Sequence, residues 1–315
     1  AAAAAAAAAA APAVAAVAAA GRDPPSPAMD PPPRAAEAPL EQHLLRVISP
    51  RAHASAFISR GVREDGRAPA DVRPLVVRVG VLRRSCGSAL VHVGDTKVAA
   101  AVACQLGVPA PETPSRGELA FDVQLTGLAH PRYDTHTKPS DALVLESRVA
   151  ALVGPALDTR QLCLAAGRAA WRLEVRLTVL SVGGELTDAA VVAAAAALLD
   201  ASLPAVDLDD AGGAAPDAAA PRARLVVSRV PAPLTVGLFD GVLLSDPTPE
   251  ELGVCDAVVT AAADERGEEC GLRKAGRGDL GAEGLAECRR RARAWAAVVA
   301  EAVVGAFREV EGRGA

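Results

Sequence analysis

The stretch RLTVLSVGGELTDAAVVAAAAALLD, residues 176–200, joins an apolar strand to an alanine-rich helix through two glycines. Glycine permits a tight turn, and the N–H groups at a helix start carry partial positive charge, so this geometry suits anion binding. After Arg176, however, no Lys or Arg follows until Arg222, well past the helix, so we expect no cation in reach of the turn, which itself carries Glu185. We therefore interpret Thr187 or Asp188 as the N-cap of the helix rather than as part of a working phosphate site.

Composition restricts the class of protein around this stretch. The chain has 315 residues, which is enough to bury a sizeable core. Hydrophobic residues make up 51% but aromatics only 2%, so Val, Leu and Ala must form that core. The net charge of −5 argues against a protein that coats itself with nucleic acid by bulk electrostatics, although local basic patches remain compatible with it.

The alanine-rich start and the cysteines exclude two further classes. Residues 1–38 are a low-complexity Ala/Pro-rich segment that we expect to be a disordered extension, because alanine is too weakly apolar to drive membrane insertion. The six cysteines contain no C-x-x-C pair and lie mostly in apolar runs. We expect reduced, buried thiols, no metal site and no cofactor.

Periodicity places the elements of one α+β domain over residues 39–310. Its first part predicts a helical arm and then a series of strands with one helix. The helical arm covers 39–61 and the strands 75–82, 88–106 (a hairpin turning at Gly94–Asp95), 118–126, 162–167 and 169–182; the helix covers 140–157. We expect Ser140 to cap that helix, and its packed face to consist of Leu143, Val144, Ser147, Ala151 and Leu152.

The second part of the domain follows a flexible insert over 207–223. Five short strands between 224 and 276 then predict an antiparallel meander, and a long helix over 281–310 ends the domain. The whole predicts an α+β fold with mixed sheets and helices packed on one side.

Several motifs, taken in order, resemble a known family. The run GVREDGRAPADVRPLVVRVGVLRRSCGSALVHVGDTKVAAAV (61–102) is similar to the opening of the RNase PH fold, which carries D-G-R, then G-S-A-L-V and a G-x-T strand start. The later LFDGVLLSDPTPEE (238–251) and CGLRKAGRGDL (270–280) resemble the members found as subunits of the eukaryotic RNA exosome ring. The resemblance covers residues 40–310 and implies the RNase PH-like fold, also called ribosomal protein S5 domain 2-like.

The resemblance also implies that catalytic residues are missing. Phosphorolytic members carry G-G-T-R-T-A, whose arginine holds the attacking phosphate, and E-D-S-x-A-x-V-D, which supplies two aspartates. Thr187 stands at the arginine position, and Pro249 and Cys255 stand at the aspartate positions. A hydroxyl cannot replace a bidentate guanidinium, and neither Pro nor Cys supplies the carboxylate that phosphoryl chemistry needs. We therefore assign no catalytic residue.

Other carboxylates near the lost positions could take the place of the two missing aspartates. Glu250, Glu251 and Asp256 lie near the lost positions, although strand alternation would turn Asp256 away from the side of Cys255. If they act, the chain is an active phosphate-dependent 3′–5′ exoribonuclease. A free-standing RNA-binding module is the other alternative, and the low aromatic content weakens it, because bases need stacking platforms.

Basic residues in two loops are candidates for RNA contact by the same resemblance. Arg116, Arg132 and Lys138 lie where ring subunits point basic loops toward RNA, and ordinary surface charge is the alternative. The nearby His130 and His136 have a spacing more typical of exposed loop residues than of metal ligands. The run CRRRARAW (288–295) is interpreted as the solvated face of the last helix.

The resemblance finally implies a role and its partners. A ring subunit of this type pairs with RNase PH-like neighbours in a six-membered ring, capped by S1/KH-type proteins, whose channel passes single-stranded RNA to a separate nuclease. The expected processes are 3′-to-5′ RNA processing and decay, including rRNA processing and mRNA decay. The expected locations are the nucleus, the nucleolus and the cytoplasm, with no membrane contact.

Overall fold

The computed structural model describes residues 46–133, 138–208, 214–217 and 222–313. The chain divides into two compact units, residues 1–49 and 50–315, and every element named below belongs to the second. The predicted disordered extension, 1–38, lies outside the described residues, as does part of the predicted flexible insert. Of the predicted helical arm, the structure describes α2 (Pro50–Ile58).

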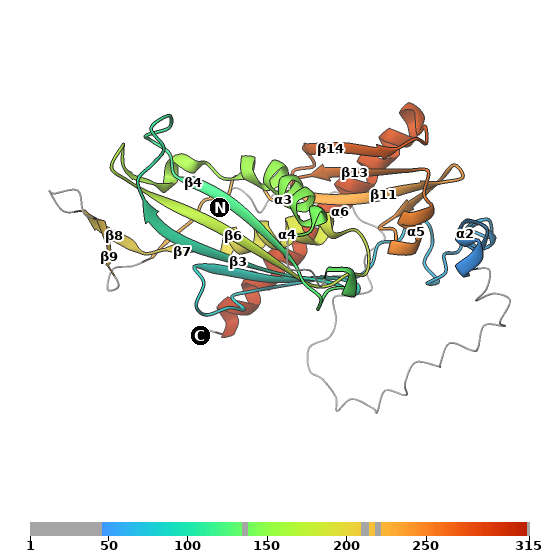
Figure 1. Cartoon of the computed structure of the whole chain (residues 1–315), viewed down its shortest axis with the longest axis horizontal. Helices are drawn as coiled ribbons and strands as arrows, with labels where there is room; N and C mark the ends of the chain where they lie inside the picture. Colours follow the sequence, from blue (N-terminus) through green and yellow to red (C-terminus); the bar gives the residue numbers. More distant parts are fainter. Residues whose placement is uncertain (1–45, 134–137, 209–213, 218–221, 314–315) are drawn as a thin grey trace, which may run out of the picture. The chain divides into compact units, whose positions relative to one another are not determined.

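The larger sheet has six strands in the order β1-β2-β3-β6-β4, with β5 paired to β6 (Figure 1). Its neighbours pair antiparallel except β4, which runs parallel to β6, so the sheet is mixed as predicted. The Gly94–Asp95 turn joins β2 to β3, with Gly94 at a φ of 54°. The strands are β1 (Leu75–Val79), β2 (Gly87–Val93), β3 (Thr96–Gly107), β4 (Glu118–Leu125), β5 (Cys163–Ala165) and β6 (Ala169–Ser181).

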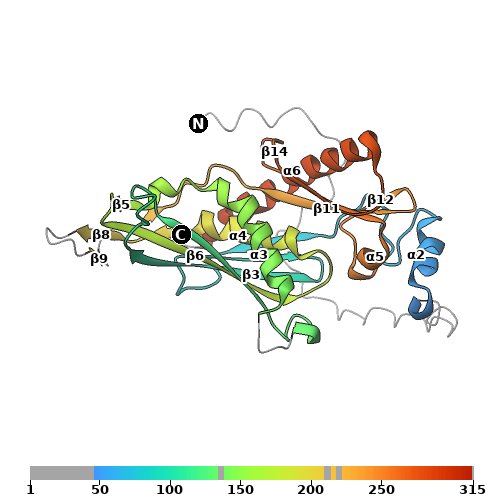
Figure 2. The ribbon, with the colours of Figure 1, turned by 45° about the horizontal axis from the view of Figure 1, so that its top comes forward.

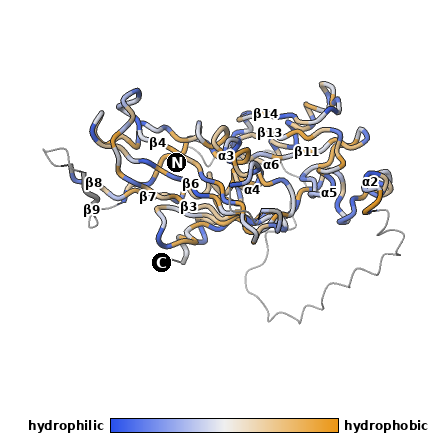
Figure 3. Tube along the Cα trace, in the orientation of Figure 1, coloured by the Kyte–Doolittle hydropathy of each residue, from blue (hydrophilic) through white to orange (hydrophobic). Residues whose placement is uncertain are grey.

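Alternation along these strands builds the core against one helix. Every second residue of β6 from Leu173 to Val179 is fully buried, as are Val98 and Val102 of β3. This face packs on α4 (Leu186–Asp200), which also contacts the second sheet. All residues of α4 from Thr187 to Leu198 are buried, because alanine side chains let the helix lie close to strands on both sides (Figures 2 and 3).

The smaller sheet is antiparallel, in the order β12-β11-β13-β14. Its face toward the C-terminal helix, α6 (Gly281–Arg313), includes the buried Val259, and Cys288, Trp295 and Val299 lie on the buried side of α6. The strands are β11 (Ala232–Phe239), β12 (Val242–Ser245), β13 (Ala257–Ala263) and β14 (Glu269–Gly276). Among the described residues no helix is both long and apolar enough to cross a membrane.

The predicted meander contains one strand too many. Residues 224–230 do not join the smaller sheet; β10 (Ala223–Arg224) pairs instead with β7 (Ser202–Leu203). The side chain of Gln161 forms two hydrogen bonds with the backbone of Val226: its Nε2 donates to the C=O, and its Oε1 accepts from the N–H, both at 2.9 Å. Within the predicted insert, the described residues form a hairpin of β8 (Ala205–Leu208) and β9 (Ala214–Asp217).

A short helix, α5 (Pro249–Val254), was not predicted. Thr248 caps it by accepting a hydrogen bond from the N–H of Glu251, whose carboxylate accepts one in return from the N–H of Thr248. The sequence signal was present, because T-P-E-E has Thr at the cap, Pro at the first position and Glu at the third.

The helix α3 (Ser140–Val153) presents a different face from the one predicted. Its buried residues are Ala142, Leu145, Val149 and Val153, whereas Leu143 and Val144 are 54% and 47% exposed. Pro139 occupies the N-cap, so the assignment of Ser140 as the cap is wrong. The helix carries two apolar stripes, and the prediction chose the outer one.

The expectation of reduced thiols is also wrong for two cysteines. Cys86 and Cys104 form a disulfide next to the paired strands β2 and β3. Their sequence separation of 18 hides this proximity, which the β2–β3 hairpin creates. Cys163, Cys255, Cys270 and Cys288 are free, but of these four only Cys288 is buried, so the expectation of buried thiols is wrong for the other three.

Candidate functional site

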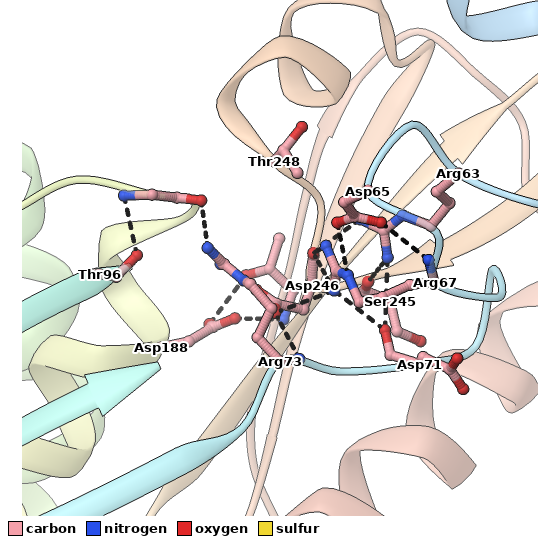
Figure 4. A network of polar contacts seen from close by, with 12 residues as sticks. Arg63, Asp65, Arg67, Asp71, Arg73, Thr96, Asp188, Ser245, Asp246 and Thr248 are labelled. Atoms are coloured by element: carbon pink, nitrogen blue, oxygen red, sulfur yellow. Dashed lines mark hydrogen bonds and ion pairs between the residues drawn. The ribbon is translucent and has the colours of Figure 1, made fainter. Parts of the chain in front are cut away.

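The D-G-R motif and the SDPTPEE segment, far apart in the chain, meet in one polar network (Figure 4). Arg63 donates to the carbonyl oxygens of Ser245 and Asp246 at 2.7 and 3.0 Å. Arg67 donates to Asp65 at 2.7 Å and to the carbonyl of Asp246 at 3.2 Å. Asp246 is a non-glycine residue with positive φ, 47°, so these bonds hold an unfavourable backbone conformation in place.

Arg63 forms the most buried ion pair of this network. Its side chain is fully buried, and its Nε lies 2.8 Å from Oε1 of Glu251, which its Nη2 also contacts at the other oxygen. Glu251 belongs to α5, so the pair fixes α5 to the D-G-R loop. A buried pair of this kind is costly to break, because either partner alone would leave an uncompensated charge.

Arg73 closes the network over the glycine turn that ends β6. Its Nε lies 2.7 Å from Oδ2 of Asp246, its Nη2 lies 2.5 Å from Oδ1, and its Nη1 donates to the carbonyl of Gly183. A Cβ atom at Gly184 would lie 2.9 Å from the Cζ of Arg73. The absence of a side chain at Gly184 therefore lets the guanidinium, which Asp246 holds in place, lie against the turn.

A second arginine reaches the start of α4 from α3. Nη1 of Arg148 lies 2.8 Å from Oε1 of Glu185 and 3.0 Å from Oγ1 of Thr187, whose hydroxyl donates to Glu185 at 2.7 Å. The expectation that no cation lies in reach of the turn is thus wrong, because Arg73 and Arg148 come from other parts of the chain. Each is already paired with a carboxylate, Asp246 or Glu185, which offsets the positive charge available to a phosphate.

The N-cap prediction for α4 is wrong as well. Glu185 occupies the cap with extended backbone (φ −68°, ψ 127°) and no side-chain cap bond, so Thr187 and Asp188 lie within the first turn. Asp188 is buried and accepts hydrogen bonds from the N–H and Oγ1 of Thr235 on β11, at 2.8 and 2.9 Å. Burial, followed by the charge of Glu185, raises the pKa of Asp188 well above its ordinary value. Asp188 therefore links α4 to the smaller sheet.

Of the three positions assigned as lost catalytic residues, Pro249 and Thr187 border adjoining hollows that share Arg148, whereas Cys255 lies apart. Pro249 lines a pocket of about 310 Å³ together with Arg148, Gly184 and Glu185. Thr187 borders the neighbouring hollow between α3 and β14. Cys255 packs away from both, against the small cluster that includes Ile58 and Phe239.

The surroundings of Cys255 suit a packing residue. Its Sγ would lie 2.6 Å from a Cβ at Gly237, so it fills the space above that glycine. Burial first, and then the charges of Glu251 and Asp256, raise the pKa of the Cys255 thiol to about 12. It is therefore a neutral thiol at physiological pH, with little thiolate to act as nucleophile or metal ligand.

Two of the substitute carboxylates are engaged in structural bonds. Glu251 pairs with Arg63 and closes the capping box of α5. Asp256 accepts hydrogen bonds from Arg51 of α2 at 2.8 and 3.2 Å, and Arg51 also contacts Asp240 and the ring of Phe239. Within the described residues, no group of three or more His, Cys, Asp or Glu is placed to hold a metal ion.

The RNA-binding candidates differ in charge compensation, and their role stays a prediction. Arg116 is exposed in the loop between β3 and β4. Lys138 lies 2.8 Å from Oδ1 of Asp122 and 2.5 Å from Oε2 of Glu146, so two carboxylates share its charge. The side chain of Arg132 and all of His136 lie outside the described residues. The basic run of α6 is largely paired, with Arg291 bound to Glu287 at 2.6 Å and Arg289 to Glu269 at 2.8 Å.

Comparisons with known proteins cover most of the chain. Residues 71–204 match domain 1 of the 3′ exoribonuclease family, and residues 229–294 match domain 2. The exosome complex component Rrp42 of Methanopyrus kandleri is 31% identical over 228 residues, 71% of this chain and 84% of that protein. Its counterpart from Thermococcus kodakarensis is 32% identical over 236 residues, 74% and 85% of the two chains.

Solved structures agree with this fold. A chain of the Archaeoglobus fulgidus exosome with RNA bound to the active site superposes with a TM-score of 0.71 at 27% identity, covering 80% of this chain and 96% of that one. A chain of an archaeal exosome core superposes with a TM-score of 0.68 at 25% identity, covering 84% and 99%. From the two matched domains and these relatives we conclude that the chain belongs to the 3′ exoribonuclease, or RNase PH, family.

Proposed function

We propose that the chain is a non-catalytic structural subunit of an exosome core ring that contributes to the RNA path in 3′-to-5′ RNA processing and decay. Its relatives are named exosome complex components and match along more than four fifths of their own length. The ring neighbours would be RNase PH-like subunits with S1/KH-type caps. The N-terminal run EQHLLRVISPRAHASAFISRGVREDGR (41–67) is most like the eukaryotic ribosomal RNA-processing protein 43, which would place the chain in the nucleus, nucleolus and cytoplasm.

The observation that carries the non-catalytic assignment is the pairing of both arginines at the glycine turn. Arg73 is bound to Asp246 and Arg148 to Glu185, while Thr187 offers a hydroxyl where the phosphorolytic motif carries an arginine. An incoming phosphate would have to displace two carboxylates from their partners. Pro249 supplies no carboxylate at the family's aspartate position, and the carboxylates that line the pocket, Glu185 and Asp141, are bound to Arg148 and Tyr133.

Affinity purification of the tagged chain from its own cells, followed by mass spectrometry, tests ring membership. We expect RNase PH-like and S1/KH proteins in stoichiometric amounts. Elution of the chain as a free monomer on gel filtration of the same extract would overturn the proposal and favour the free-standing RNA-binding module.

A further inference from the structure

The outer apolar stripe of α3 borders a groove that the proposed function does not use. Ala151 and Leu152 form one wall, and β13 and β14 form the other. The walls touch where Leu152 lies over Gly271: a Cβ there would be 2.7 Å from Cδ2 of Leu152. The hollow has a volume of about 220 Å³, enough for one or two apolar side chains.

The strand beside this groove has an open edge. β14 pairs with β13 on one side, and within the part of the chain that the structure describes no strand pairs with its other side (Figure 1). Its outer backbone N–H and C=O groups can therefore pair with an added strand. Leu272, in the middle of β14, is 38% exposed and adds apolar surface at the same place.

Positive charge lies at one end of the groove. Arg273 and Arg148 line the hollow, and no Asp or Glu does so among the described residues. Arg148 is already paired with Glu185, so Arg273 is the cation that an occupant would meet. Lys274 and Arg277 follow on β14 and directly after it, both exposed. At the start of β14, Asp264, Glu265 and Glu268 act electrostatically on the Cys270 thiol, and Glu269 is bound to Arg289 of α6 at 2.8 Å. The end of the groove at Arg273 therefore favours an occupant with negative charge.

An acidic protein segment fits these features better than RNA. Apart from Arg148 and Arg273, the hollow is lined by aliphatic and small side chains. No aromatic ring is among its described lining residues, so it offers no aromatic stacking platform for a base. An open strand edge offers backbone hydrogen bonds in the regular spacing of a polypeptide.

We propose that the groove between α3 and β14 binds an extended segment of a partner protein, which adds a strand to β14, places an apolar side chain over Leu152 and pairs a carboxylate of the same face with Arg273. This surface adjoins the glycine turn, because Arg148 and Thr187 line it too, but the proposal does not rest on ring membership.

Fluorescence anisotropy of the full chain with three labelled probes tests this proposal. The probes are a peptide with leucine and aspartate at alternate positions of one strand face and serine on the other face, the same peptide with lysine for aspartate, and a uridine oligonucleotide. We expect the acidic peptide alone to bind. Arg273→Glu should weaken it by about tenfold or more and allow the lysine peptide to bind. Ala151→Trp, which fills the hollow, should weaken both peptides in either background.

Arg290→Glu is the matched control, because Arg290 is exposed on α6 and pairs with Glu287 of the same helix. It should leave binding of the acidic peptide unchanged, and thermal unfolding should show that all three variants stay folded. Absence of acidic-peptide binding, or equal losses in Arg273→Glu and Arg290→Glu, would overturn the proposal. Displacement of the acidic peptide by the oligonucleotide, with Arg273→Glu weakening the oligonucleotide, would assign the groove to RNA instead.

Discussion

Arginine–carboxylate pairs occur in two neighbouring regions that differ in what surrounds them. Around Asp246, Arg63, Arg67 and Arg73 join loops and strands and are largely enclosed by protein. At the start of α4, Arg148 and Glu185 border an open pocket of about 310 Å³. The first region holds the two halves of the fold together, whereas the charges of the second border a pocket and are paired within the chain. Enclosure by protein, rather than the presence of a charge pair, therefore decides how much each pair contributes to stability.

Removing the enclosed ion pair between Arg63 and Glu251 should give the largest loss of stability. Arg63→Met leaves Glu251 buried and uncompensated, so we expect the free energy of unfolding to fall by about 3–5 kcal/mol. Urea denaturation measures this change. Arg290→Met, which removes an exposed helix pair, should cost less than about 1 kcal/mol. Equal costs for the two substitutions would contradict the distinction between enclosed and open charges.

Arg73, which Asp246 holds against the glycine turn, connects the two regions, and a substitution at Gly184 tests this contact. Gly184→Ala forces a methyl group against the guanidinium that Asp246 holds in place, and we expect a loss of about 1–3 kcal/mol. Gly253→Ala on α5 is the matched control, because a Cβ there meets no atom within 4 Å. It should be neutral or stabilising by up to about 1 kcal/mol, as for a helical glycine. A neutral Gly184→Ala would mean that Arg73 does not need the turn.

Asp188 connects the open region to the smaller sheet and should make stability depend on pH. Its folded pKa lies above the ordinary value of 3.8, so the protonated form favours folding. That contribution is present below about pH 4 and is lost as pH rises through the folded pKa. Asp188→Asn should flatten this decline in urea denaturation series across pH, and the exposed Asp279→Asn should not. An unchanged slope in Asp188→Asn would refute the assignment.

The smallest effects are expected at the surface, in RNA binding by the assembled ring. Removing the charges of Arg116 and Arg132 together should weaken RNA retention and reduce the slope of log affinity against log salt by about 1 for each phosphate that the ring no longer binds. Lys138→Ala should change the slope less, because Asp122 and Glu146 already share its charge. If Lys138→Ala reduces the salt slope more than the loss of Arg116 and Arg132 does, pairing with carboxylates within the chain does not determine which basic residues bind RNA.

The sequence predicted those features that depend on local pattern. Alternation located the strands of the larger sheet, and the Gly94–Asp95 turn located its first hairpin. The outer stripe of α3 was mistaken for the buried one, because both stripes are apolar and only the position of α4 selects between them. Likewise, Arg73 and Arg148 are 110 and 37 residues away from the turn residues that they contact, so only the fold brings them there. Long-range pairing leaves no periodic signal in the sequence.

The proposal that the chain does not catalyse phosphorolysis of RNA is tested most directly by one assay. The purified chain, and separately its Thr187→Arg, Pro249→Asp and Cys255→Asp variants, are incubated with an RNA that has a labelled 3′ tail, with and without inorganic phosphate. We predict no phosphate-dependent release of nucleoside diphosphates from any of them, because catalytic groups of this kind act as a unit and no single substitution restores the set. Phosphate-dependent release by the unmodified chain would contradict this claim.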